Sequence, residues 1–148
     1  MTQNTNHNLI TSLNKALSNH FALYIKTQNY HWNIQGPAFL NLHELFETQY
    51  TEISSFIDAT AEHIRSLNSK VPASFEIFNK NCEILPGNES FTASEMIKDL
   101  IQSHETMEKV LKEALQETET ASDHVINDYL IGCLTFHRKA LWFLKSSL

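Results

Sequence analysis

The chain has 148 residues, of which 42% are apolar, and this is enough for one hydrophobic core but short for two ordinary domains. It contains only three Gly and three Pro, which excludes sandwiches, barrels and doubly wound sheets, because their many turns consume these residues. The formal net charge is -6, so metal cations are more natural charged partners than nucleic acid or anionic lipid. We expect one helical domain over residues 1–148.

No targeting or membrane signal is evident. Residues 1–8 have neither a positive segment nor an apolar stretch, and no uncharged apolar run approaches the length of about 18 residues that a transmembrane helix needs. Cys82 and Cys133 lie far apart and form no motif, so we interpret them as reduced thiols. These features predict a cytoplasmic protein without membrane association.

Hydrophobic periodicity predicts a first helix over residues 8–33. Apolar side chains recur there at steps of three and four residues, namely Leu9, Leu13, Ala16, Leu17, Phe21, Tyr24 and Ile25. Gly36 then suits a helix C-cap, and Pro37 suits the first turn of the next helix.

The second predicted helix runs over residues 37–67 and is the longest. Its stripe consists of Leu42, Leu45, Phe46, Gln49, Ile53, Phe56, Ile57, Thr60 and Ile64. Residues 68–90 are mixed in character, and a gap of this length without any structure is uncommon in a compact domain. Phe75, Ile77 and Phe78 therefore predict a short helix within it.

The capping-box pattern from Thr92 to Glu95 predicts the start of a third helix, which ends near Thr118. Its stripe is Met96, Leu100, Met107, Val110, Leu111 and Leu115. A fourth helix begins at Asp123 with the stripe Val125, Tyr129, Leu130, Leu134, Leu141 and Leu144. Two short connections and one long one predict an all-α four-helix bundle with a long crossover between the second and third helices, carrying the short extra helix.

The predicted second helix carries two pairs of potential metal ligands. His43 and Glu47 form one pair, and Asp58 and Glu62 form the other; the i, i+4 spacing places both members of a pair on one helix face. From His43 to Asp58 the helix rises about 22 Å at 1.5 Å per residue. One metal ion therefore cannot contact both pairs within one chain.

The two pairs share a common centre. The two outer ligands and the two inner ligands have the same midpoint, immediately after Glu52. If two copies of the helix pack antiparallel about a twofold axis there, each His43/Glu47 pair faces an Asp58/Glu62 pair of the other chain, and two equivalent sites form. Small side chains near the midpoint would let the helices approach closely: Thr51, Ser54 and Ser55.

His31, near the end of the first helix, is a candidate fifth ligand. Imidazole with several carboxylates suits Fe(II), Mn(II) or Zn(II), and ligands borrowed from two chains leave coordination positions for water or an oxidant. The competing interpretation is a solvated surface, since polar residues at i, i+4 are common on exposed helices. The other histidines lack such a ligand pattern and are expected at the surface or in hydrogen bonds: His7, His20, His63, His104, His124 and His137.

The sequence resembles the Dps family of bacterial mini-ferritins. The segments that carry the resemblance are YIKTQNYHWNIQGP at residues 24–37, LHELFE at 42–47 and DATAEHIR at 58–65, with weaker similarity at residues 127–128 and 139–142. The resemblance implies a ferritin-like bundle that assembles into a hollow homo-dodecamer. It also implies a ferroxidase that oxidises Fe(II), preferably with hydrogen peroxide, stores the ferric mineral and so protects against oxidative stress.

The resemblance assigns the same ligands as the spacing. His31, His43 and Glu47 of one subunit would act with Asp58 and Glu62 of its twofold mate. Glu47 is a departure, because many family members have Asp, and the extra methylene lengthens the ligand arm. Trp32 would lie close to the iron and take up oxidising equivalents, or alternatively pack at the subunit contact.

Other family features are present only in part. Asp123 and Asp128 resemble the acidic residues of the family's threefold entry pores, although Asp123 also suits a helix first turn. DNA-binding members often use a Lys/Arg-rich tail, but the first basic residue here is Lys15, so we expect weak or no DNA binding. Met96 and Met107 belong to the core stripe, and no haem site is expected.

Two alternatives predict different chemistry. A ferritin or bacterioferritin with a di-iron centre inside one bundle needs Glu three residues before His, and none of the eight histidines has it. A non-enzymatic Dps-fold protein that acts in DNA compaction or surface interaction is the second alternative.

Overall fold

The computed structural model describes residues 2–148, with side chains from residue 5 onward, and contains five helices and no strand in this range. The helices are α1 (Thr2–Asn33), α2 (Phe39–Ser66), α3 (Phe75–Asn81), α4 (Ala93–Ala121) and α5 (His124–Lys145). The predicted all-α architecture with four long helices and one short one is therefore confirmed.

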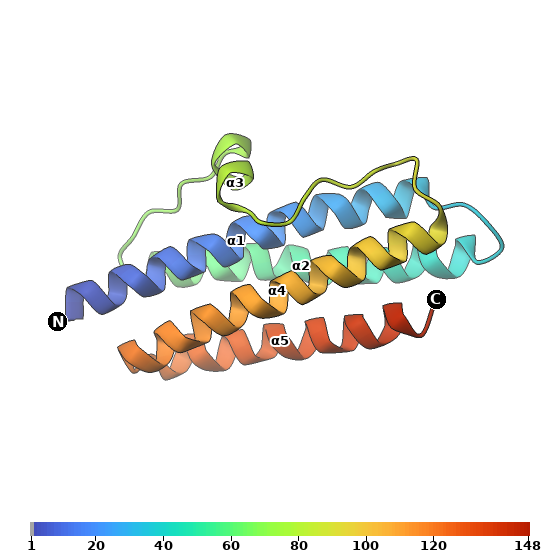
Figure 1. The fold of residues 1–148 in the computed structure, drawn as a ribbon. Coiled ribbons are helices and arrows are strands. Elements are labelled where there is room, and N and C mark those ends of the chain that lie inside the picture. Colours follow the sequence, from blue (N-terminus) through green and yellow to red (C-terminus); the bar gives the residue numbers. More distant parts are fainter. Residues whose placement is uncertain (1) are drawn as a thin grey trace.

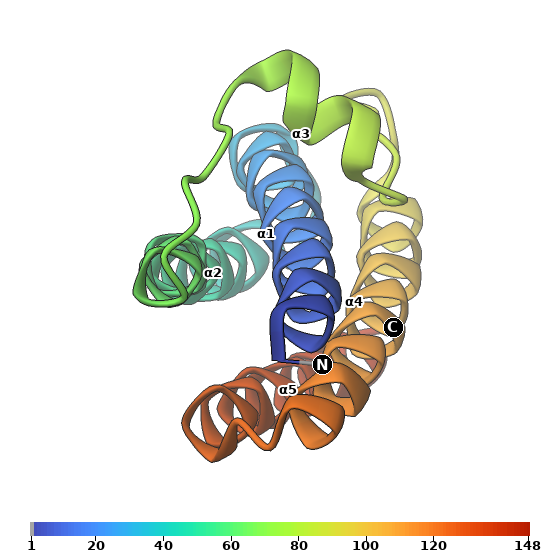
Figure 2. The ribbon, with the colours of Figure 1, turned by 90° about the vertical axis from the view of Figure 1, so that its left-hand side faces the viewer.

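The four long helices form an elongated bundle (Figure 1). Helix α1 packs closely against α2 and α4, and α4 packs against α5, whereas α2 and α5 make few contacts. The view along the bundle shows α3 lying outside α1, on the far side from α5 (Figure 2). The bundle thus has three closely packed helix pairs, α1–α2, α1–α4 and α4–α5, and one loosely packed pair, α2–α5.

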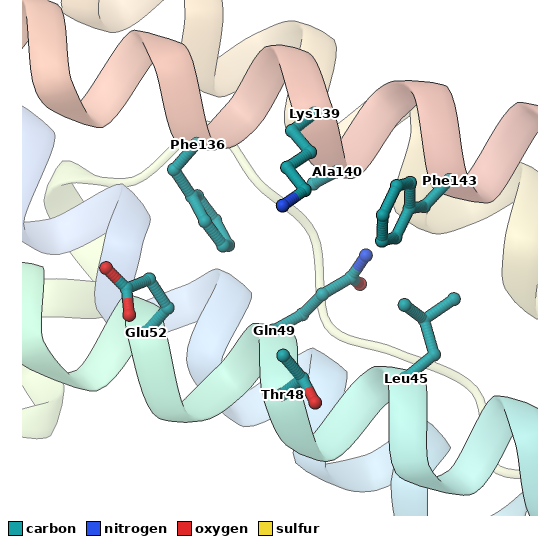
Figure 3. A pocket seen from close by; sticks show the side chains of 8 residues that line it. All are labelled: Leu45, Thr48, Gln49, Glu52, Phe136, Lys139, Ala140 and Phe143. Carbon is teal, nitrogen blue, oxygen red and sulfur yellow. The ribbon is translucent and has the colours of Figure 1, made fainter.

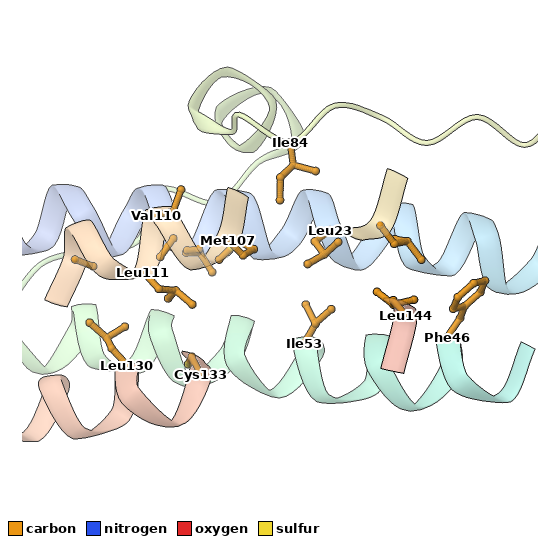
Figure 4. Close-up of a cluster of buried hydrophobic side chains, with 14 of the residues drawn as sticks. Leu23, Phe46, Ile53, Ile84, Met107, Val110, Leu111, Leu130, Cys133 and Leu144 are labelled. Carbon is orange, nitrogen blue, oxygen red and sulfur yellow. The ribbon is translucent and has the colours of Figure 1, made fainter. Parts of the chain in front are cut away.

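The core lies between the long helices (Figure 4). Fully buried apolar side chains reach it from all four, including Leu23 from α1, Ile53 from α2, Met107 from α4 and Leu130 from α5. Met96 is also fully buried, in agreement with its assignment to the core.

Two residues that were predicted on the buried stripes are exposed in the structure. Val125 is 72% exposed and Ile25 is 46% exposed. In α1 the buried positions shift from Ile25 to its neighbours Leu23 and Lys26, and in α5 the first buried apolar residue is Ile126. The predicted stripes were therefore out of register by one or two residues in these turns.

The helix ends follow local capping. Thr92 and Glu95 form the predicted capping box, with the Thr92 N–H donating to Glu95 Oε2 at 2.8 Å and the Glu95 N–H donating to Thr92 Oγ1 at 3.2 Å. The largest differences from the predicted boundaries are that α1 begins at Thr2 instead of Asn8, α2 begins at Phe39 instead of Pro37, and α4 extends to Ala121.

The long crossover is held onto α1 by side chains. Asn19 Oδ1 accepts hydrogen bonds from the backbone N–H groups of Glu83 at 2.8 Å and Ile84 at 3.2 Å. Nearer the end of α1, the Tyr30 hydroxyl accepts from the Asn88 N–H at 3.1 Å. These bonds satisfy backbone donors that have no partner in a helix.

Candidate metal centre

His31 and His43 are the predicted ligands that the structure brings together. His31 lies at the end of α1 and His43 in the second turn of α2, and their rings stack with centroids 3.8 Å apart and planes 12° apart. The α1–α2 connection makes this possible. Gly36 has φ +118°, a conformation that glycine adopts without strain, and the chain reverses there.

Each of these rings is oriented by the other residue's backbone. His31 Nδ1 lies 2.7 Å from the His43 carbonyl oxygen, and His43 Nδ1 lies 2.6 Å from the His31 carbonyl oxygen. A carbonyl oxygen only accepts, so each Nδ1 carries a proton and donates it. In the neutral ring the Nε2 atom then carries the lone pair, which is the form of histidine that binds a metal.

Two aromatic side chains that were not predicted as site residues complete this corner. Phe39 stacks on His43 with centroids 5.2 Å apart, and Tyr50 meets the His31 ring edge-on at 5.3 Å. Burial and the nearby Glu47 carboxylate raise the pKa of the Tyr50 hydroxyl. The two imidazoles are therefore packed between aromatic rings, which restricts their orientation.

The three predicted carboxylate ligands lie on α2 with exposed side chains: Glu47, Asp58 and Glu62. The small residues Thr51 and Ser54 between them are exposed as well. Across residues 5–148 of one chain, no group of three or more His, Cys, Asp or Glu side chains is arranged to hold a metal ion. The structure thus pairs the two histidines and leaves the carboxylates on an outward stripe of α2.

Of the remaining predicted site residues, Trp32 and Asp128 are exposed and Asp123 is half-buried. Trp32 follows His31 and is 67% exposed. Asp123 is the N-cap of α5, where its Oδ1 accepts from the Ile126 N–H at 2.9 Å, so it has a structural role whatever else it does. Asp128 is exposed one turn further along α5.

A second histidine cluster was not anticipated. His20 Nε2 lies 2.8 Å from His137 Nε2, and His137 Nδ1 lies 2.8 Å from His104 Nδ1. All three side chains are fully buried, so the surface interpretation was wrong for them and the hydrogen-bonded one is confirmed. They lie at the helical spacing of the buried faces of α1, α4 and α5, and this spacing could have indicated that they are buried.

Burial controls the protonation of this cluster. Burial lowers the pKa of His20 to about 3, with a further contribution from nearby His104, and lowers the pKa of His104 to about 3. Burial and both neighbouring imidazoles lower the pKa of His137. The three rings are therefore neutral at neutral pH and form one hydrogen-bonded chain through the bundle.

The two cysteines are unpaired, as expected from the sequence. Both cysteines are free thiols, Cys82 partly buried and Cys133 fully buried. Burial raises the pKa of the Cys133 thiol to about 11, which keeps it protonated. None of the helices in the described part of the chain is long and apolar enough to span a membrane.

The chain is similar to known proteins in both sequence and structure. A family model described as a ferritin-like domain matches residues 10–148. DNA protection during starvation protein 2 of Bacillus anthracis is 32% identical over 143 residues, which cover 97% of this chain and 98% of the relative. The crystal structure of a Dps protein from Bacillus brevis superimposes with a TM-score of 0.93 at 29% identity, covering 97% of this chain and 96% of that one.

A third similar structure is the Dps protein of Vibrio cholerae O1. It has a TM-score of 0.92 and 26% identity, and covers 97% of this chain and 90% of its own. That protein is described as a member of a broad superfamily of ferritin-like diiron-carboxylate proteins.

Proposed function

Because this chain belongs to the Dps family of the ferritin-like superfamily, we propose that it oxidises Fe(II) at sites shared between two subunits and stores the ferric product. His31, His43 and Glu47 of one subunit would bind the iron together with Asp58 and Glu62 of a second. The iron is the substrate and cargo of the protein, and no haem takes part.

The observation that carries this proposal is the reciprocal hydrogen bonding of His31 and His43. Two backbone carbonyls fix both Nδ1 protons, so two Nε2 lone pairs are prepared for a metal without any rearrangement of the backbone. Along α2, Glu47 and Asp58 lie equally far from the twofold axis inferred from the sequence, and so do His43 and Glu62. A second copy packed antiparallel on this stripe would therefore bring Asp58 and Glu62 to the histidines.

The chemistry follows from the donor set. Carboxylate and imidazole ligands suit Fe(II), and the sharing of ligands between chains leaves positions for an oxidant. With hydrogen peroxide, two Fe(II) ions lose one electron each, and the peroxide O–O bond is cleaved as two protons are taken up and two water molecules form. A paired reaction of this kind releases no hydroxyl radical, which supports a role against oxidative stress. Trp32, next to His31 and exposed, would pack at the subunit contact or take up oxidising equivalents.

Assembly into a hollow homo-dodecamer in the cytoplasm would provide the storage space. Asp128 and Asp123 would line entry pores, where a ring of carboxylates raises the local Fe(II) concentration. The net charge of -6 favours attraction of cations. It also supports weak or absent DNA binding, because phosphate contacts dominate DNA affinity; tight complexes in a gel-shift assay at low salt and neutral pH would contradict this.

The proposal is tested by anaerobic loading with Fe(II) followed by addition of hydrogen peroxide, with the ferric product followed by absorbance. His43→Ala and Asp58→Ala should each lose most of the fast oxidation, because each removes a ligand of every site. His124→Ala, at an exposed position of α5, is the matched control and should oxidise iron like the wild type. Fast oxidation in the His43→Ala variant would show that the site is elsewhere, whereas no fast oxidation by the wild type would favour the non-enzymatic alternative.

A further inference from the structure

A cavity of about 300 Å³ lies between α2 and α5, where the bundle is loosely packed. Its walls are mainly apolar, with Leu45 on α2 and Phe136 and Phe143 on α5 (Figure 3). The volume corresponds to the lower end of the range for small-molecule sites, about 300–1,000 Å³. The cavity can therefore accept a compact molecule of one or two rings.

The cavity contains a buried polar group without a partner. Gln49 is 3% exposed, and neither its Nε2 nor its Oε1 has a hydrogen-bond partner among the described residues. Figure 3 shows its amide rising from α2 into the space below α5. Buried amides are nearly always hydrogen-bonded, because an unpaired one loses its bonds to water without replacement.

The two amide atoms define the chemistry that fits. A carboxamide offers one acceptor and an NH₂ donor side by side, so its natural complement presents a donor beside an acceptor. A carboxylate offers acceptors alone and would leave Gln49 Oε1 unpaired. Glu52 and Lys139 both line the cavity, so their opposite charges do not select an anion. The faces of Phe136 and Phe143 favour a flat ring.

We propose that this cavity is a binding site for a planar ring compound with a carboxamide or lactam edge, which pairs with the Gln49 amide while the ring lies between Phe136 and Phe143. Lys139 stands at the mouth, with its Nζ 5.4 Å from the Phe143 ring centroid. The Lys139 ammonium group is not a hydrogen-bond partner of Gln49.

This site is separate from the metal centre. At about 100° per residue, Gln49 points roughly 160° away from Glu47 around the axis of α2. Gln49 is buried on the side of α5, whereas Glu47 is exposed on the outward stripe. The inference therefore does not depend on the ferroxidase proposal, and variants of Gln49 should leave iron oxidation unchanged.

The test uses the assembled protein and three probes of similar size: benzamide, N,N-dimethylbenzamide and benzoate. Saturation-transfer difference NMR is suitable because it observes the ligand and tolerates a large assembly. We expect benzamide to bind in preference to both other probes. Gln49→Met keeps the side-chain length and removes both polar atoms, and it should weaken benzamide binding by about tenfold or more, because two hydrogen bonds are lost.

Gln116→Met is the control, since Gln116 is exposed on α4, and it should bind benzamide like the wild type. The unfolding midpoint of each variant reports whether it is folded. Three results would overturn the proposal: no benzamide binding to the wild type up to its solubility, equal binding to the Gln49→Met variant, or tighter binding of benzoate than of benzamide.

Discussion

His31 and His43 hold each other in place: each donates its Nδ1 proton to the backbone carbonyl of the other, at 2.7 and 2.6 Å, and their rings stack. The acceptors are backbone atoms on two different helices. The backbone of the α1–α2 corner therefore orients each ring, and we expect one imidazole to keep its hydrogen bond when the other side chain is substituted. Metal affinity can consequently be attributed to the imidazoles themselves.

The first prediction concerns His31. His31→Ala leaves the His31 carbonyl in place as acceptor for His43 but removes one metal-binding lone pair, so affinity for a divalent metal should fall by at least about 10-fold. Anaerobic titration with Co(II), followed by its visible absorption, measures this without iron oxidation. The His124→Ala variant should match the wild type. Undiminished Co(II) affinity in His31→Ala would exclude His31 as a ligand.

The second prediction concerns the outward stripe of α2. Ser54 is exposed and lies near the inferred twofold axis, so Ser54→Arg should leave the helices of one chain intact and prevent two α2 helices from approaching. Analytical ultracentrifugation should then show a smaller assembly than the wild type. Thr120→Arg, at an exposed position of α4, should keep the wild-type mass. A wild-type mass for Ser54→Arg would contradict this contact.

The third prediction concerns the buried imidazole chain. The pKa values of His20 and His104 fall from the usual 6.5 to about 3 in the folded state, so the unfolded chain binds more protons between these values. Stability that is present above pH 6.5 is therefore lost as the pH falls towards 3, by about 1.4 kcal/mol per pH unit for each histidine.

Urea unfolding from pH 7.5 to pH 4.5 at one fixed protein concentration measures this loss. His104→Gln keeps a hydrogen-bonding group but cannot titrate, and its slope should be smaller by about 1.4 kcal/mol per pH unit. His124→Gln, which is exposed, should keep the wild-type slope. An equal slope in His104→Gln and the wild type would show that the lowered pKa of His104 does not cause the loss of stability.

The fourth prediction concerns the ion pair beneath the crossover. Lys26 is 2% exposed, and its Nζ lies 3.1 Å from Asp99 Oδ1 and 3.0 Å from Ser103 Oγ. The Tyr30 hydroxyl donates to the same carboxylate. Asp99→Ala leaves a buried ammonium group without its counter-charge and should lower the free energy of unfolding by about 3 kcal/mol.

The double variant Lys26→Met/Asp99→Ala tests the cause. If the unpaired charge is responsible, the double variant should be more stable than Asp99→Ala alone. Glu119→Ala, exposed near the end of α4, controls for the loss of a surface carboxylate and should change the unfolding free energy by less than about 0.5 kcal/mol. A double variant no more stable than Asp99→Ala would show that the carboxylate acts through other contacts.

The helices were predictable because their apolar residues repeat with the period of the helix, and burial follows that period. The helix ends were less predictable. The first residues of α1 are polar and show no apolar pattern, but the helix begins at Thr2. The buried His20, His104 and His137 were missed because the predicted stripes of their helices contained only apolar residues, so a histidine at the same spacing was not counted.

For the candidate site, the ligand set came from spacing and resemblance, whereas the orientation of the rings did not. The stacking of His31 on His43 depends on the path of the chain through Gly36, which spacing along one helix does not describe. Phe39 and Tyr50 were missed for the same reason. Gln49 was predicted on the stripe and is buried, but its lack of a partner depends on how far apart α2 and α5 lie.

One active site should need two chains, and complementation between inactive variants tests this most directly. In a dimer of one His43→Ala chain and one Asp58→Ala chain, one site loses both ligands and the other keeps all of them. Random co-assembly of the two variants in equal amounts should therefore restore about a quarter of the wild-type peroxide-dependent Fe(II) oxidation, whereas each variant alone stays inactive. Mixed assemblies as inactive as the separate variants would contradict a site shared between chains.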